Sequence, residues 1–118
     1  MTQEESLKQL LLKDLCARLP YDVCVHIRYK DGEPCYGKLT TRDIQWFIDS
    51  KIEVIKPYLR PMSSMTEEEF DEYESIKCWR EEYELIDWLN AHHFDYRGLI
   101  EKGLAIAVTE ENNPYKEK

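Results

Sequence analysis

The sequence predicts a single α+β domain with an N-terminal helix, an antiparallel β-meander of three to four strands, a long capped helix and a short C-terminal helix. Three observations predict this class. Leucines recur at helical spacing over residues 6–19, apolar and polar residues alternate over residues 21–29, and a capping-box sequence opens a long amphipathic segment at Thr66. We assign the domain to residues 1–108 and a polar, frayed tail to residues 109–118.

The first helix is expected over residues 6–19, where its leucines share one face. Ser6 follows two glutamates and is the expected N-cap. Pro20 is the expected stop, because the residue before a proline is disfavoured in the helical region.

The first strand is expected over residues 21–29, followed by a three-residue hairpin loop at residues 30–32. Pairing Tyr29 with Glu33 across this loop keeps the apolar residues of both strands on one face. The same register turns Cys35 towards the core.

Two further strands are expected over residues 44–48 and 51–56, and Pro57 and Pro61 are expected to prevent any continuation as a central strand. The resulting meander either curls into an SH3-like barrel or stays an open sheet covered by helices. The sequence pattern leaves both arrangements open.

A long helix is expected to begin at Glu67, because Thr66 and Glu69 occupy the two positions of a capping box. Its apolar stripe later swings by about a quarter turn on a helical wheel. This swing predicts either a break near residues 83–85 or a second half that is buried on two sides.

A shorter helix is expected over residues 96–102, with Asp95 as its N-cap and Gly103 as its left-handed terminator. Residues 104–108 are then either a short strand or a packed extension.

The net charge of −8 is unevenly distributed along the chain. Residues 1–62 carry a charge of +1 and residues 63–118 a charge of −9. This acidity argues against direct nucleic-acid binding, which needs cations for the phosphates. A helix–turn–helix over residues 82–103 would offer only Arg97 and Lys102 for that purpose.

We expect a cytoplasmic protein. No apolar run approaches the roughly 18 to 20 residues that span a bilayer, and the N-terminus lacks the order of a secretory signal. The four cysteines form no C-x-x-C pair and are expected to be reduced thiols.

Adjacent histidines make the segment around His92 and His93 resemble an active site. Neighbours on a helix diverge by about 100°, so these two cannot share a metal ion. Cys78 with both histidines and Asp95 has the residue types of a small hydrolase, and this set is kept as an alternative. We otherwise assign no catalytic residue, cofactor or metal, since phosphate-loop and nucleophile-elbow motifs are absent from the sequence.

Aromatic residues are more numerous than one small core face needs. Trp and Tyr are enriched at binding hot spots, so these residues are the expected partner-binding surface. The set consists of Trp79, Tyr83, Trp88, Phe94 and Tyr96.

The stretches LLKDLCARLP (residues 11–20), KPYLRPMSSMTEEE (residues 56–69) and WLNAHHFDYRGLIEKGLA (residues 88–105) resemble small uncharacterised proteins encoded by gut Bacteroidetes and by their phages and prophages. This resemblance implies a mobile-element accessory protein of the bacterial cytoplasm and carries no known activity.

The leading functional hypothesis is therefore a non-enzymatic module that binds a protein partner. The hydrolase built from Cys78, His92, His93 and Asp95 is the first alternative. An acidic DNA mimic that occupies a nucleic-acid-binding protein is the second. The sequence also leaves a homo-oligomer open.

Overall fold

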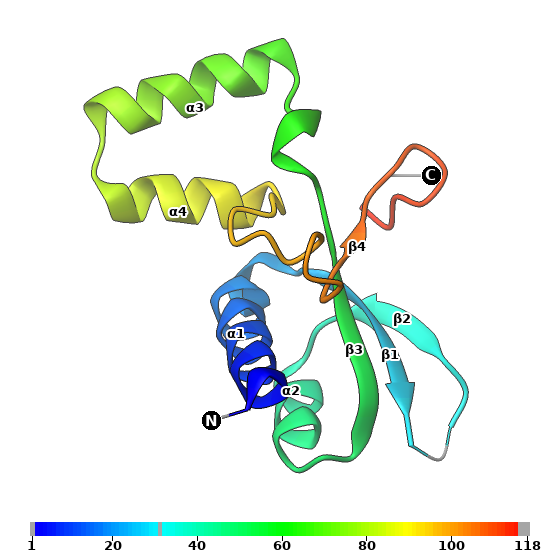
Figure 1. Cartoon of the computed structure of the whole chain (residues 1–118). Helices are drawn as coiled ribbons and strands as arrows, with labels where there is room; N and C mark the ends of the chain where they lie inside the picture. The colour runs from blue at the N-terminus through cyan, green and yellow to red at the C-terminus, as the bar shows by residue number, and fades with distance from the viewer. Residues whose placement is uncertain (1, 31, 116–118) are drawn as a thin grey trace.

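The computed structural model describes residues 2–30 and 32–115, and it confirms the α+β class. The helices are α1 (Gln3–Arg18), α2 (Thr41–Ile48), α3 (Glu67–Trp79) and α4 (Glu82–Ala91), with 3-10 turns at Leu19–Tyr21 and Met62–Ser64. The strands are β1 (Cys24–Tyr29), β2 (Cys35–Lys38), β3 (Ile52–Leu59) and β4 (Ile106–Ala107), as Figure 1 shows.

The four strands form an open mixed sheet in the order β2-β1-β3-β4. β1 pairs antiparallel with both β2 and β3, whereas β4 pairs parallel with β3. The predicted meander is therefore wrong in its order, because β3 returns beside β1 instead of following β2. With β2 and β4 at its two edges, the sheet does not close into the SH3-like barrel that the sequence left open.

The predicted register of the first hairpin is confirmed. Ile27 pairs with Cys35 and Val25 pairs with Gly37, as the alternation of the two strands requires. Cys35 is nevertheless exposed and not turned into the core, because all four residues of β2 lie beyond the covering helices. Asp31, in the hairpin loop, lies outside the described residues.

Residues 44–48 belong to helix α2 and not to the predicted strand. The helix begins with a capping box, in which the Thr40 hydroxyl accepts from the Asp43 amide at 3.2 Å and the Asp43 carboxylate accepts from the Thr40 amide at 3.1 Å. It ends at Ile48 with Asp49 as the C-cap, and Ser50 follows with a φ of +62°, the left-handed conformation typical just after a helix C-terminus. Capping at both ends outweighs the β propensity of the aromatic and branched residues between them.

Strand β3 runs through Pro57 to Leu59, although the proline was expected to end it. Pro57 lies opposite Val25. The Val23 carbonyl, just before β1, accepts from the Leu39 amide, just after β2. Val25, two residues further on, directs its backbone groups to the same side, which is away from β3. Pro57 therefore lies in a non-hydrogen-bonded pair, where no amide has to donate to β1, and the strand can continue through it.

Helix α1 and helix α2 cover one face of the sheet (Figure 1). α1 begins at Gln3, where Thr2 and not Ser6 is the N-cap, since the Thr2 hydroxyl accepts from the Glu5 amide at 3.2 Å. The core lies between α1 and the central strands. Its fully buried aliphatic residues are Leu15, Val23, Val25, Leu59 and Leu99.

Helices α3 and α4 form a hairpin, here called the acidic hairpin (residues 67–91), which stands beyond the end of the sheet (Figure 1). The predicted capping box at Thr66 and Glu69 is confirmed, with both of its hydrogen bonds present. The helical segment breaks at Arg80, three residues before the expected region, because Arg80 adopts an extended conformation. Among the described residues, no helix is long and apolar enough to cross a membrane.

Residues 96–102 form successive turns and not the predicted helix. Asp95 does bind the following amides, but it accepts from Leu99 at 2.8 Å and Ile100 at 3.0 Å, four and five residues ahead. Gly98, at a φ of +72°, interrupts the turns before a helix can form. Gly103 has the predicted left-handed conformation, and β4 supplies the short strand that follows.

Candidate functional site

The acidic hairpin accounts for the net charge of the protein. Residues 67–91 carry ten carboxylates against Lys77 and Arg80, a net charge of −8, which equals the charge of the whole chain. Positive and negative side chains in the rest of the molecule therefore balance. Helix α3 buries none of its residues and packs chiefly on α4. The hairpin is thus a strongly negative projection on a neutral body.

Two of the five predicted partner-binding residues lie on the surface of this hairpin. Trp79 is 84% exposed at the end of α3, and Tyr83 is 66% exposed in the first turn of α4. The sequence prediction missed a third exposed ring, Phe70, which is 51% exposed on α3. Its position after the capping box, on a helix made mostly of charged residues, was the signal that could have found it.

The other three predicted residues form the joint between the hairpin and the body. Phe94 is fully buried, and Trp88 stacks on it with 5.7 Å between ring centroids. Tyr96 is half-buried, and its hydroxyl donates to Asn90 Oδ1 at 2.8 Å. These rings hold α4 in place and are not available as a free surface.

Arg60, at the end of β3, fastens the hairpin to the body. Its guanidinium donates to both carboxylate oxygens of Glu69, at 2.7 and 2.6 Å, and lies 4.2 Å from the ring centroid of Phe94. The hydrogen bonds from Arg60 lower the pKa of Glu69 to about 2. Sequence reasoning missed this pair, because the two residues are nine positions apart and the sequence does not show that the end of β3 and the start of α3 lie close together.

The structure distributes the four residues of the hydrolase hypothesis over different surroundings. Cys78 is exposed on α3, and both oxygens of Asp95 accept from backbone amides. The His92 ring stacks on Trp88, whereas the His93 ring stacks on Tyr115. Among the residues that the structure describes, no hydrogen bond joins any two of these four side chains.

His93 closes helix α4 in a left-handed conformation with a φ of +63°. The His93 amide donates to the Asn90 carbonyl at 3.0 Å and the Phe94 amide to the Leu89 carbonyl at 3.0 Å, which is the Schellman pattern of a helix end. Burial, and then the nearby Arg18 charge, lower the pKa of His93 to about 4. The paired histidines therefore lie at the end of helix α4.

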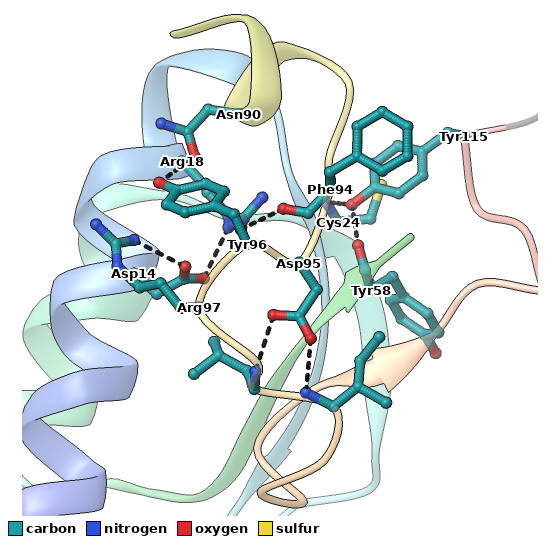
Figure 2. Close-up of polar contacts among 12 residues, drawn as sticks. Asp14, Arg18, Cys24, Tyr58, Asn90, Phe94, Asp95, Tyr96, Arg97 and Tyr115 are labelled. Carbon is teal, nitrogen blue, oxygen red and sulfur yellow. Dashed lines mark hydrogen bonds and ion pairs between the residues drawn. The ribbon is translucent and has the colours of Figure 1, made fainter. Parts of the chain in front are cut away.

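A buried polar network ties the segment after α4 to helix α1 (Figure 2). The Asp14 carboxylate accepts from Arg18 Nε at 2.7 Å and from Arg97 at 2.9 Å. Arg18 also donates to the Phe94 carbonyl at 2.7 Å. Asp14 and Arg18 are fully buried, so their charges depend on each other and on this carbonyl.

Tyr115 docks the C-terminal segment on the sheet, so the predicted frayed tail is wrong for this residue. Its hydroxyl donates to the Tyr58 carbonyl at 2.6 Å and accepts from the Cys24 amide at 2.9 Å, which places it between β1 and β3 (Figure 2). Its ring stacks on His93 with 3.8 Å between centroids. Residues 116–118 of the predicted tail lie outside the described residues.

The four cysteines are free thiols, as expected. Within residues 2–30 and 32–115, no group of three or more His, Cys, Asp or Glu side chains is arranged to hold a metal ion. Comparison of the chain with protein-family models, with curated proteins and with solved structures gives no match. The geometry and charge of the molecule are therefore the observations from which a function can be inferred.

Proposed function

We propose that the protein is a non-enzymatic binding module that contacts a protein partner through the acidic hairpin. The exposure of Trp79 and Tyr83 on this hairpin carries the proposal. Single exposed apolar residues are ordinary, but a tryptophan and a tyrosine exposed close together on a projecting hairpin contribute little to the core. Trp and Tyr are also the residues most enriched at binding hot spots.

The charge of the hairpin indicates the chemistry of the partner. A net charge of −8 on residues 67–91 is complementary to a surface rich in lysine and arginine. A second copy of the hairpin would bring like charges together, which argues against a homo-oligomer through this surface. An acidic DNA mimic is a narrower form of the same proposal, but it would need carboxylates alone and gives no role to the exposed rings.

The proposal is tested by partner capture with matched variants. Wild-type protein, Trp79→Ala/Tyr83→Ala and Tyr36→Ala are immobilised and exposed to a cytoplasmic lysate of the source cells. Tyr36 is a suitable control, because it is 71% exposed on β2, away from the hairpin. We expect a protein that the wild type and the control retain and that the double variant binds at least about tenfold more weakly.

Two results would contradict the proposal. One is a partner that the double variant retains at full strength. The other is a substrate turnover that disappears when His92 and His93 are replaced together. A captured complex should also weaken as salt is added, since the charges of the hairpin are exposed.

A further inference from the structure

Strand β2 and the C-terminal loop lie on the side of the molecule away from the acidic hairpin (Figure 1). Strand β2, the end of β3 and the C-terminal loop line a cavity of about 260 Å³ that is open to solvent. The cavity is lined by Tyr36, Tyr58, Glu111, Asn112, Asn113 and Pro114.

The loop that forms one wall is held by its own hydrogen bonds. The Asn112 amide donates to the Thr109 hydroxyl at 3.1 Å, and the Tyr115 amide donates to Asn113 Oδ1 at 2.9 Å. The docked hydroxyl of Tyr115 then fixes the end of the loop to β1 and β3. The cavity is therefore formed before any ligand arrives, which lowers the entropic cost of binding.

The polar groups around this cavity are not used within the protein. Among the described residues, no hydrogen bond engages the Glu111 carboxylate, the side-chain amide of Asn112 or the hydroxyl of Tyr36. The Tyr58 hydroxyl and the Asn113 Nδ2 group are likewise without a partner there. Tyr36, Glu111, Asn112 and Asn113 are exposed, so their polar groups are open to a ligand that arrives from solvent.

The lining selects one class of ligand. No cation lines the cavity and Glu111 adds a negative charge, which disfavours a phosphate or a carboxylate. The exposed ring of Tyr36 offers an apolar face beside side-chain amides, which donate and accept, and the Glu111 carboxylate, which accepts. A pyranose ring matches this arrangement, because it presents a C–H face to an aromatic ring and a rim of hydroxyls to the polar groups. We propose that the cavity binds a neutral saccharide through one pyranose unit.

This site is independent of the proposed protein partner, and NMR can test it on the whole chain. The 15N-labelled protein is titrated with methyl glucoside, methyl galactoside, methyl mannoside and N-acetylglucosamine, each to tens of millimolar. We expect at least one of them to shift the side-chain amide signals of Asn112 and Asn113, with a Kd in the millimolar range. If none shifts these signals, or if uridine, guanosine or inorganic phosphate shifts them more strongly, the proposal is overturned.

Variants show whether the shifts report binding at this cavity. Asn112→Ala and Tyr36→Ala should each weaken the best saccharide about tenfold, because each removes one group that contacts it. Asn112 is preferred to Asn113, since its side chain makes no hydrogen bond that holds the loop. Tyr83→Ala, an exposed tyrosine on the acidic hairpin, should leave the affinity unchanged. Equal affinity in all three variants would also overturn the proposal.

Discussion

Replacing Tyr115 with phenylalanine tests whether one hydroxyl joins the C-terminal segment to the sheet. The ring and its stacking on His93 remain, but the Cys24 amide and the Tyr58 carbonyl both lose their partner. Both residues are only 8% exposed, so water cannot easily replace the hydroxyl. A buried polar group left unpaired costs about 1–3 kcal/mol, so we expect Tyr115→Phe to lower the free energy of unfolding by about 2–4 kcal/mol.

Urea denaturation measures this loss, and amide hydrogen exchange places it in the structure. The Cys24 amide should exchange slowly in the wild type and much faster in Tyr115→Phe. Tyr83→Phe is the matched control, because Tyr83 is exposed and its hydroxyl has no partner among the described residues. A Tyr115→Phe protein within about 0.5 kcal/mol of wild type, with unchanged protection of the Cys24 amide, would refute the reasoning.

The Tyr115 hydroxyl should also make the stability of the protein depend on pH. Burial raises the pKa of Tyr115 above its ordinary value of 10. Because the folded pKa is the higher one, the stabilisation is complete below pH 10 and is lost as the pH rises above it. Stability should therefore fall above pH 10 by less in Tyr115→Phe than in the wild type.

Three further substitutions test the joints of the fold. Glu69→Gln removes the charge that Arg60 binds, and urea denaturation should show a loss of about 2 kcal/mol at neutral pH. The pKa of Glu69 is lowered from 4.5 to about 2, so the extra stability of the wild type over Glu69→Gln is complete above pH 4.5 and disappears as the pH falls towards 2. A difference in stability that stays constant across that range would contradict this. His93→Gly should be more stable than His93→Ala by about 1 kcal/mol in the same assay, because only glycine adopts a φ of +63° without cost, and equal midpoints would count against that. Asp14→Ala leaves the Arg18 charge buried and should cost about 3 kcal/mol or more, so a thermal midpoint near that of wild type would show that the network contributes little.

Local signals in the sequence predicted local structure well. The capping box at Thr66 gave the start of α3, and the alternation of residues 24–38 gave the register of the first hairpin. Both depend on neighbours within a few residues or across a short loop. The same rule, applied to Thr40 and Asp43, would have identified α2, but a short apolar run has no clear period and was interpreted as a strand.

Contacts between distant segments could not be predicted in this way. Arg60 and Glu69 meet only because β3 directs the chain past α4, and Tyr115 reaches Cys24 across 91 residues. The predicted partner-binding residues differ in the same way. The exposure of Trp79 and Tyr83 follows from their places at a helix break, whereas Phe94 is buried because the body folds over it. Composition indicated aromatic excess, but only the fold shows which rings face water.

Site-specific photocrosslinking can show whether the acidic hairpin contacts a partner in the cell. Trp79 is replaced by photoreactive benzoylphenylalanine, and a second protein carries the same replacement at Tyr36 as the control. Both side chains are exposed, at 84% and 71%, so neither replacement should disturb the core. We predict one protein adduct that forms from position 79 and is absent from position 36. Adducts from position 36 alone, or from neither position, would contradict a binding role for the hairpin.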